Sequence, residues 1–301
     1  MHHWRGAGNV RIAGDTWGSP SGPLVLLLHG GGQTRHAWKG VGQMLARAGY
    51  FAVAFDARGH GDSDWAPDGQ YSQNAMVEDL EHVIATLDKG RPALVGASMG
   101  GGTSLVAAGE GRVDATALVL VDIAPRIEPE GIANIDAFMS QSPEGFESLE
   151  AVASAIASYQ PHRARPRNLD GLGKNVRLAP DGKFRWHWDP RFRPSKRDLV
   201  ARHRRLEACA ANLRLPVLLV RGGLSDVLTD DGAREFLGLC PHAEYVSITD
   251  AAHMVAGDRN DSFGNAVLGF LSRVVPLGGP PAYAPSDQRH YPSGADVQDV
   301  P

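Results

Sequence analysis

The pentapeptide Gly96-Ala-Ser-Met-Gly100 sets a serine between two glycines, directly after a short apolar run and before a helical pattern. A nucleophile at so tight a strand-to-helix turn must adopt a strained backbone, so its neighbours must be small. Gly101 and Gly102 extend the run of small residues. A pentapeptide of this kind also occurs by chance, but the flanking strand and helix favour chemistry. The pattern predicts Ser98 as an activated nucleophile.

A serine hydroxyl needs a base to take its proton, and that base needs a partner to orient it. The order nucleophile, acid, histidine is met by Asp226, in a turn-like Gly-Gly-Leu-Ser-Asp segment, and by His253 after the next apolar run. We therefore predict His253 as the base and Asp226 as the acid. Asp122, which follows another apolar run, is an alternative acid. The structural alternatives are a turn-forming or helix-capping Asp226 and a surface His253.

A tetrahedral intermediate develops an oxyanion, which preorganised N–H donors must stabilise. The amide of Met99, the residue after the nucleophile, is one expected donor. The second is expected from the loop His29-Gly-Gly-Gly32, where we predict Gly31. This loop lacks the lysine and the glycine spacing of a phosphate-binding loop. His29 itself is expected to bond within the loop.

Elements that would position these residues follow an alternation of apolar runs and helical patterns, which indicates a parallel sheet covered by helices on both faces. Asp230 and Asp231 fit the first turn of a helix. The expected strands are Leu24–Leu28, Phe51–Phe55, Ala93–Val95, Ala117–Val121, Pro216–Val220 and Ala243–Ile248, with a possible hairpin over Val10–Gly18. Expected core helices include Asp230–Leu239 and Asn260–Val274.

The alternation breaks between residues 124 and 212, where we expect helices at Ile132–Met139, Phe146–Ser158 and Ser195–Cys209. This predicts a core in two parts, 1–124 and 213–275, with an inserted helical cap at 125–212. Trp186 and Trp188 are expected to pack in the cap, with one of them available to line a pocket. The proline-rich residues 276–301 lack apolar periodicity and are expected to form a disordered tail.

Composition sets broad limits on function. Among 301 residues, 43% are hydrophobic and 21% charged, as in ordinary globular proteins. The net charge of −4 gives no reason to expect a nucleic acid as partner. Two cysteines, Cys209 and Cys240, indicate small buried thiols and no disulfide framework. No signal-peptide layout and no membrane-length apolar run is visible. A cytoplasmic monomer or homodimer is the default expectation.

Metal and cofactor motifs are not found in the sequence. The twelve histidines are scattered, without an H-E-x-x-H motif or paired cysteines. Neither a metal nor a cofactor is therefore expected.

Positive charge is concentrated in one segment. Between Gln160 and Leu206 stand eleven arginines and three lysines against four aspartates, a local excess of +10. A positive field over a catalytic site would attract anionic substrates. The simpler interpretation is that these side chains face solvent or pair with the acidic remainder of the chain.

Four segments together resemble α/β-hydrolases of the epoxide-hydrolase and haloperoxidase-like branch: His29–Trp38, Asp56–Ser63, Gly96–Gly100 and Ala252–Asp261. The resemblance covers about residues 24–275. It implies the α/β-hydrolase fold, with an eight-stranded, mostly parallel sheet and a helical cap over its catalytic edge. It also implies the roles given above to Ser98, Asp226, His253, Gly31 and Met99. Asp56 and Arg58 are interpreted as tying down their loop, although Arg58 and His60 also invite a functional interpretation.

One departure narrows the chemistry. Epoxide hydrolases and haloalkane dehalogenases of this branch use an aspartate where this chain has Ser98, so the resemblance argues against those activities. The serine version resembles esterases, perhydrolases and C–C hydrolases. The expected function is hydrolysis of a small-molecule carboxylic ester through an acyl-enzyme, including small or anionic esters such as monoalkyl phthalates. The alternatives are C–C hydrolysis or perhydrolase or lyase chemistry with the same triad, and a non-enzymatic ligand-binding module.

Overall fold

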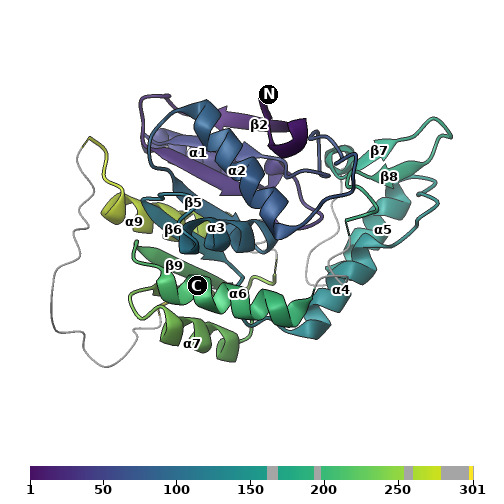
Figure 1. Ribbon diagram of the computed structural model, residues 1–301. Coiled ribbons are helices and arrows are strands. Elements are labelled where there is room, and N and C mark those ends of the chain that lie inside the picture. Colours follow the sequence, from purple (N-terminus) through teal and green to yellow (C-terminus); the bar gives the residue numbers. More distant parts are fainter. Residues whose placement is uncertain (161–168, 193–197, 254–259, 279–297, 301) are drawn as a thin grey trace, which may run out of the picture.

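A computed structural model describes residues 1–160, 169–192, 198–253, 260–278 and 298–300. Its centre is one nine-stranded sheet in the order β1-β2-β4-β3-β5-β6-β9-β10-β11 (Figure 1). The strands are β1 (His2–Arg5), β2 (Arg11–Trp17), β3 (Leu24–Leu28), β4 (Phe51–Phe55), β5 (Ala93–Ala97), β6 (Ala117–Val121), β9 (Val217–Gly222), β10 (Glu244–Ile248) and β11 (Gln298–Val300).

The sheet confirms the predicted α/β class and its eight mostly parallel strands. β1 and β2 are antiparallel to their neighbours, and every strand from β4 to β10 in this order is parallel to the next. The N-terminal hairpin differs from expectation, because it turns through η1 (Ala7–Asn9) while Gly14-Asp15 lies inside β2.

A ninth strand, β11, extends the sheet by pairing parallel with β10. Its three residues fall in the tail expected to be disordered, so that expectation does not hold for them. Residues 279–297 and 301 of the tail lie outside the described residues.

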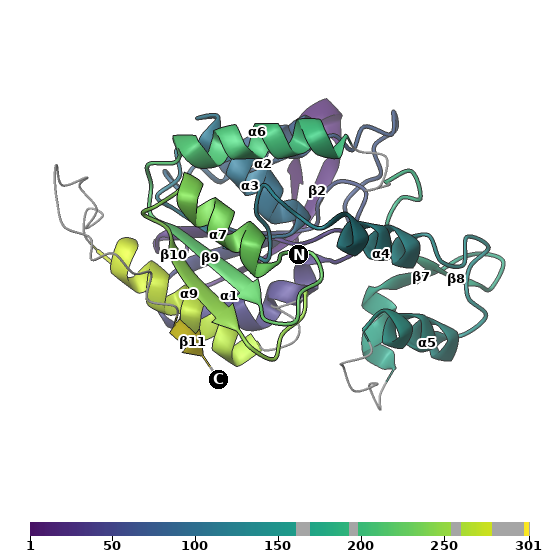
Figure 2. The same cartoon turned by 90° about the horizontal axis from the view of Figure 1, so that it is seen from below.

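Helices cover both faces of the sheet, as predicted. Side chains that alternate along β3 separate two cores: Leu24, Leu26 and Leu28 face one, and Val25 and Leu27 face the other. The first core is closed by α2 (Gln73–Leu87), α3 (Met99–Gly109), α6 (Leu199–Asn212) and α7 (Asp230–Leu239); the second by α1 (Lys39–Arg47) and α9 (Asn260–Val274) (Figure 2). In the described part of the chain, no helix combines the length and apolarity that crossing a bilayer requires.

An inserted segment projects from one end of the sheet between β6 and α6. It contains α4 (Pro129–Met139), α5 (Leu149–Tyr159), η3 (Asp170–Lys174) and the hairpin of β7 (Val176–Leu178) with β8 (Phe184–Trp186) (Figure 1). Its aromatic side chains belong to a third apolar cluster, which also contains Tyr71, Met76 and Met99 of the core. Phe146, expected in a helix, instead pairs with Phe184 beside the hairpin.

Helix α6 differs from the predicted division of the chain. Its Leu206, Cys209 and Ala210 are buried in the first core, beside α3 and α7. The helix assigned to the end of the cap is therefore a core helix, and the inserted segment ends before it. Both cysteines are buried and free, and burial raises each thiol pKa to about 11, as expected for inert core residues.

Polar contacts join the inserted segment to the loop after β4. The Gly61 amide donates to His187 Nδ1 at 2.8 Å, and the Asp189 amide donates to the Gly59 carbonyl at 2.8 Å. The Tyr71 hydroxyl also donates to the Asp189 carboxylate. This junction is buried, since His187 is 2% exposed and Asp189 1%.

The buried junction makes stability depend on pH. Desolvation lowers the pKa of His187 from 6.5 to about 3. Between about pH 3 and pH 6.5, His187 is protonated in the unfolded chain but not in the folded chain. The free energy of unfolding therefore falls as the pH drops below about 6.5. His187→Asn, whose side-chain oxygen can still accept from Gly61, should reduce the loss of unfolding free energy between pH 7 and 5. The reduction should approach ~1.4 kcal/mol per pH unit in urea titrations.

The exposed His82, on α2, provides the matched control for this prediction. His82→Asn should leave the difference between pH 7 and 5 as in the parent chain. If His187→Asn and the parent lose the same stability on acidification, His187 does not carry the effect.

Candidate active site

Ser98 lies in the sharp turn between β5 and α3 with φ 47° and ψ −109°. Its amide donates to the Val121 carbonyl at 3.0 Å, which ties the turn to the end of β6. A Cβ on Gly96 would lie 2.5 Å from the Gly100 carbonyl oxygen, and one on Gly100 would lie 2.4 Å from that of Leu28. The small residues flanking Ser98 are therefore sterically required, as the sequence predicted.

Ser98 and His253 line the same cavity, which has a volume of about 300 Å³. Most of its wall is apolar. Most of the apolar lining residues come from the inserted segment and from the loop after β6. Trp186 and Trp188 both line it and stack on each other at 4.7 Å, so these tryptophans serve both of the expected roles. Other apolar lining residues include Ile123, Ile127, Phe138 and Phe192.

His253 is held by Asp122. His253 Nδ1 lies 2.7 Å from Asp122 Oδ2, and the two side chains are 10% and 0% exposed. Because a carboxylate only accepts, Nδ1 carries the proton and donates it, which leaves Nε2 as the basic nitrogen. The second oxygen, Asp122 Oδ1, accepts from the Gly222 amide at 2.8 Å. The hydrogen bonds of Asp122 thus link the ends of β6 and β9 to His253 in the loop after β10.

Asp226, the acid predicted from sequence, bonds to another residue, although it lines a second cavity together with His253. It is exposed, and its Oδ2 accepts from Asn134 Nδ2 of α4 at 3.0 Å. Its neighbour Ser225 turns inward and donates from Oγ to Asp122. The structure therefore brings the alternative acid, Asp122, to His253 in place of Asp226.

Both aspartates satisfy the order and the strand-end position that guided the prediction. The signal that separates them is local. Asp122 follows five consecutive buried residues of β6 without an intervening turn, and its own φ is 51°. Asp226 comes four residues after β9, inside a polar turn. The buried carboxylate is therefore that of Asp122, the aspartate with the shorter connection to its strand.

The glycine loop after β3 approaches Ser98 closely. A Cβ on Gly30 would lie 3.3 Å from the Ser98 Cβ. The Gly30 amide is used internally, because it donates to Gln33 Oε1 at 3.0 Å. Among the described residues, none accepts a hydrogen bond from the amide of Gly31 or of Met99. Neither predicted oxyanion donor is thus used by a residue that the structure describes, and Gly31 and Met99 both line the cavity.

Buried ion pairs hold the glycine loop and the loop after β4 in place. The buried Asp56 carboxylate accepts from the Arg35 amide at 2.7 Å and pairs with the Arg35 guanidinium, which also contacts Asp15 and Asp62. Arg58 pairs with Asp79 on α2. Asp56 and Arg58 therefore anchor their loops, as interpreted from sequence, although each does so through a different partner.

The histidines of these loops are also structural. His29 Nδ1 contacts the Gly30 carbonyl at 2.8 Å, its Nε2 accepts from the Ala57 amide at 2.9 Å, and burial lowers its pKa. His60 Nε2 accepts from the Gly32 amide at 3.2 Å. These contacts order the loop rather than offering His29 or His60 to a reactant.

Positive charge at the cavity wall comes from Arg202 of α6 and Lys174 of η3. Several other described cations of the basic segment form ion pairs, namely Arg185–Asp181, Lys183–Glu147, Arg191–Asp189 and Arg205–Glu110. Of these four pairs, three lie within the inserted segment and only that with Glu110 reaches the rest of the chain. Arg163, Arg165, Arg167, Arg193, Lys196 and Arg197 lie outside the described residues.

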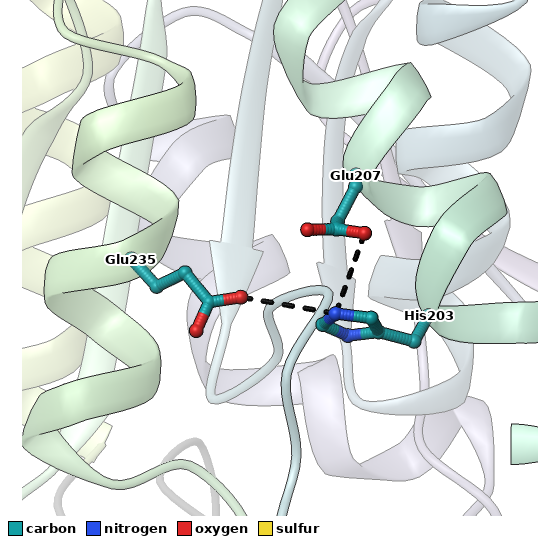
Figure 3. Close-up of side chains that lie close together, drawn as sticks. All are labelled: His203, Glu207 and Glu235. Carbon is teal, nitrogen blue, oxygen red and sulfur yellow. Dashed lines mark ion pairs between the residues drawn. The ribbon is translucent and has the colours of Figure 1, made fainter. Parts of the chain in front are cut away.

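Only one group of side chains in the described part of the chain has the spacing of metal ligands. His203 and Glu207 of α6 face Glu235 of α7, with His203 Nε2 3.4 Å from Glu207 and 3.8 Å from Glu235 (Figure 3). Arg126 also contacts Glu235, at 3.6 Å. None of the three lines the cavity. The cluster joins the two core helices α6 and α7 away from the cavity.

Comparison with known proteins identifies the family. Residues 23–259 match the model of the alpha/beta hydrolase fold family. Esterase Rv0045c of Mycobacterium tuberculosis is 31% identical over 85% of this chain and 84% of its own. The 3-hydroxybutyrate-oligomer hydrolase of Cupriavidus necator is 29% identical over 82% and 88%.

A solved structure extends the likeness in fold. That of E-2-(acetamidomethylene)succinate hydrolase superposes with a TM-score of 0.78 at 24% identity, over 90% of this chain and 98% of the other. The chain therefore belongs to the α/β-hydrolase fold family, and its relatives support an enzyme of the hydrolase class.

The glycines of α3 yield a stability prediction. Gly100→Ala should lower the unfolding free energy by ~1–3 kcal/mol or more, because its Cβ would collide with the Leu28 carbonyl. Gly102→Ala should be neutral or add up to ~1 kcal/mol, because its Cβ would lie 3.4 Å or more from its neighbours and alanine favours helix. Urea unfolding measures both. Equal losses for the two variants would contradict the steric account.

Proposed function

We propose that this protein is a serine hydrolase that cleaves carboxylic esters through an acyl-enzyme. Ser98 is the nucleophile, His253 the general base and Asp122 the residue that orients His253. The observation that carries the proposal is the contact of His253 Nδ1 with the buried Asp122, with His253 and the strained Ser98 on the wall of one cavity. This arrangement supplies the three roles that serine-based acyl transfer needs.

In acylation, Ser98 Oγ attacks the ester carbonyl and passes its proton to His253 Nε2. The resulting imidazolium donates from Nδ1 to the Asp122 carboxylate, which stabilises the new positive charge. Asp122 remains ionised, with its other oxygen on the Gly222 amide. His253 then returns the proton to the departing alcohol. In deacylation, His253 takes a proton from water, and the water oxygen attacks the carbonyl of the acyl-enzyme. His253 then returns the proton to Ser98 Oγ as the carboxylic acid is released.

The amides of Gly31 and Met99 are the proposed oxyanion donors. Met99 opens α3, so its N–H lies among those at a helix start that have no partner within the helix. The partial positive charge of the helix N-terminus further favours an oxyanion there. Because internal hydrogen bonds hold the glycine loop in place, its amides need little rearrangement during the reaction.

The cavity favours a small substrate with an apolar body. A volume of about 300 Å³ lies at the lower end of small-molecule sites. Two cations on its wall, Arg202 and Lys174, extend the proposal to anionic esters, with monoalkyl phthalates as one example. The similarity to a 3-hydroxybutyrate-oligomer hydrolase supports this extension, because such an oligomer combines ester bonds with a terminal carboxylate.

The identity of the acid can be tested directly. Asp122→Asn should reduce kcat on 4-nitrophenyl butyrate by about 10³–10⁴-fold, because the amide no longer fixes the His253 tautomer or stabilises its cation. Asp226→Asn removes one exposed carboxylate contact and should change kcat by less than about threefold. Circular dichroism of both variants verifies folding. A large loss with Asp226→Asn and a small one with Asp122→Asn would restore the sequence-based assignment.

The nucleophile is tested by covalent labelling. A fluorophosphonate should add once to the chain, at Ser98, and Ser98→Ala should abolish both labelling and ester turnover. Ser104, buried on the same helix with its hydroxyl bonded to the Gly100 carbonyl, offers a matched control in Ser104→Ala. Undiminished ester turnover by Ser98→Ala would reject the acyl-enzyme. Turnover of vinylogous diketones, with esters left intact, would favour C–C hydrolysis.

A further inference from the structure

Gly102 is not required by crowding, unlike the two glycines before it in α3. A Cβ at either of those positions would come within 2.4 Å of a neighbouring residue. Among the described residues, a Cβ on Gly102 would meet Gln73 Oε1 at 3.4 Å and Arg202 Nη2 at 3.9 Å. Alanine stabilises a helix more than glycine does. The glycine instead leaves open space on the wall of the cavity that Ser98 and His253 line.

The nearest polar atom to this space is the side-chain oxygen of Gln73, at the start of α2. Gln73 lines the catalytic cavity, and its Nε2 donates to Thr103 Oγ1 at 2.8 Å. The Thr103 hydroxyl donates its one hydrogen to the Met99 carbonyl at 3.0 Å, so its oxygen can only accept from Gln73. These two bonds determine which end of the Gln73 amide faces Thr103. The other end, the acceptor Oε1, therefore faces Gly102.

This acceptor is not used by the protein itself. No residue that the structure describes donates a hydrogen bond to Gln73 Oε1. Arg202, which borders the same space from α6, donates from Nη1 to the Pro125 carbonyl at 3.4 Å. A polar group on the wall of a mostly apolar cavity gains a hydrogen bond when a ligand supplies its partner. Gln73 Oε1 is thus available to a ligand that donates.

The charges around the space determine which kind of donor fits. A carboxamide oxygen accepts hydrogen bonds only, so it repels the oxygens of an anion. The Arg202 guanidinium, whose Nη2 lies 3.9 Å from the Cβ position of Gly102, disfavours a second cation such as an ammonium group. A neutral hydroxyl donates to the Gln73 oxygen without either repulsion.

We propose that Gln73 Oε1 binds a hydroxyl group of the ester substrate in the space over Gly102. This inference rests on the proposed ester hydrolysis at Ser98 and names a substrate class for that site. The Gly102 amide donates to the Ser98 carbonyl at 2.9 Å, so one helical turn, about 6 Å along the axis, separates the two residues. A hydroxyl three bonds from the scissile carbonyl carbon, with an O–H···O bond of about 2.8 Å, spans such a distance. Esters of 3-hydroxy acids meet this requirement.

The test compares two neutral esters of similar size with the same leaving group: 4-nitrophenyl 3-hydroxybutyrate and 4-nitrophenyl 3-methylbutyrate. The measured quantity is the ratio of their kcat/KM values, each divided by the rate of alkaline hydrolysis to remove intrinsic reactivity. Gln73→Leu should lower this ratio by about tenfold, because the hydroxyl loses its acceptor. The loss should lie mainly in KM, since the hydroxyl is remote from the reacting atoms. An unchanged ratio overturns the proposal.

Two further variants separate the acceptor from the space. Gln73→Glu keeps an oxygen acceptor at this position, so it should retain a ratio well above that of Gln73→Leu. Gly102→Ala should lower the ratio as Gln73→Leu does, because its methyl group occupies the space of the hydroxyl. A ratio in Gly102→Ala equal to that of the parent chain would place the hydroxyl elsewhere and overturn the proposal.

Asn74→Leu is the matched control. Asn74 is the next residue of α2; it is exposed, accepts from Arg205 Nη2 at 2.7 Å and does not line the catalytic cavity. This variant should leave the ratio as in the parent chain. An equal loss with Asn74→Leu would mean a general disturbance of α2, which overturns the proposal. A loss with Arg202→Gln and none with Gln73→Leu overturns it as well.

The two levels of inference fail differently. Hydrolysis of both esters with a ratio independent of Gln73 rejects the hydroxyl site and leaves ester hydrolysis standing. Failure to hydrolyse either ester, together with an unlabelled Ser98, rejects both.

Discussion

The left-handed backbone of Ser98 is the constraint on which the rest of the site depends. A non-glycine residue at φ 47° is strained, so surrounding contacts must hold it. Two hydrogen bonds do so: the Ser98 amide donates to Val121 at the end of β6, and the Gly100 amide donates to His29 at the end of β3. The turn therefore joins three neighbouring strands at their carboxyl ends.

The same junction brings the other groups together. Asp122 follows Val121 directly, and the glycine loop follows His29 directly. One strained residue thus sets the positions of the proposed acid and of the proposed oxyanion donors through bonds to their immediate neighbours. The crowding at Gly96 and Gly100 is the steric consequence, because the helix must start against β3 for these bonds to form.

The sheet was predictable because its strands are buried on both faces. β3, β4 and β6 consist of uninterrupted apolar residues, and their observed limits coincide with the predicted ones. The nucleophile was equally predictable, since its turn demands small residues at fixed spacing. The acid was not, because Asp122 and Asp226 both follow strands in the required order. The contact of Asp122 with His253 separates them in the structure, and the corresponding local difference is that Asp122 follows its buried strand directly while Asp226 follows a turn.

The inserted segment was predictable only in outline. Its elements are short and depend on each other, as in the stacking of Trp186 on Trp188 and the pairing of Phe146 with Phe184. Such contacts leave no local periodicity. Helix α6 shows the converse problem: its basic face resembles the segment before it, while its buried Leu206 and Cys209 belong to the core. Charge density alone could not locate this boundary.

The position of α6 in the core changes how the positive charge of the basic segment is interpreted. Most of its described cations are neutralised by nearby carboxylates, so the local excess of charge does not by itself create a substrate site. Helix α6 itself packs against α3, the helix that begins beside Ser98. Its buried Leu206 and Cys209 fix it on the core, so its position relative to the nucleophile is set by core packing and not by the conformation of the inserted segment. Any side chain of α6 that reaches the cavity is therefore placed by the same core that places Ser98.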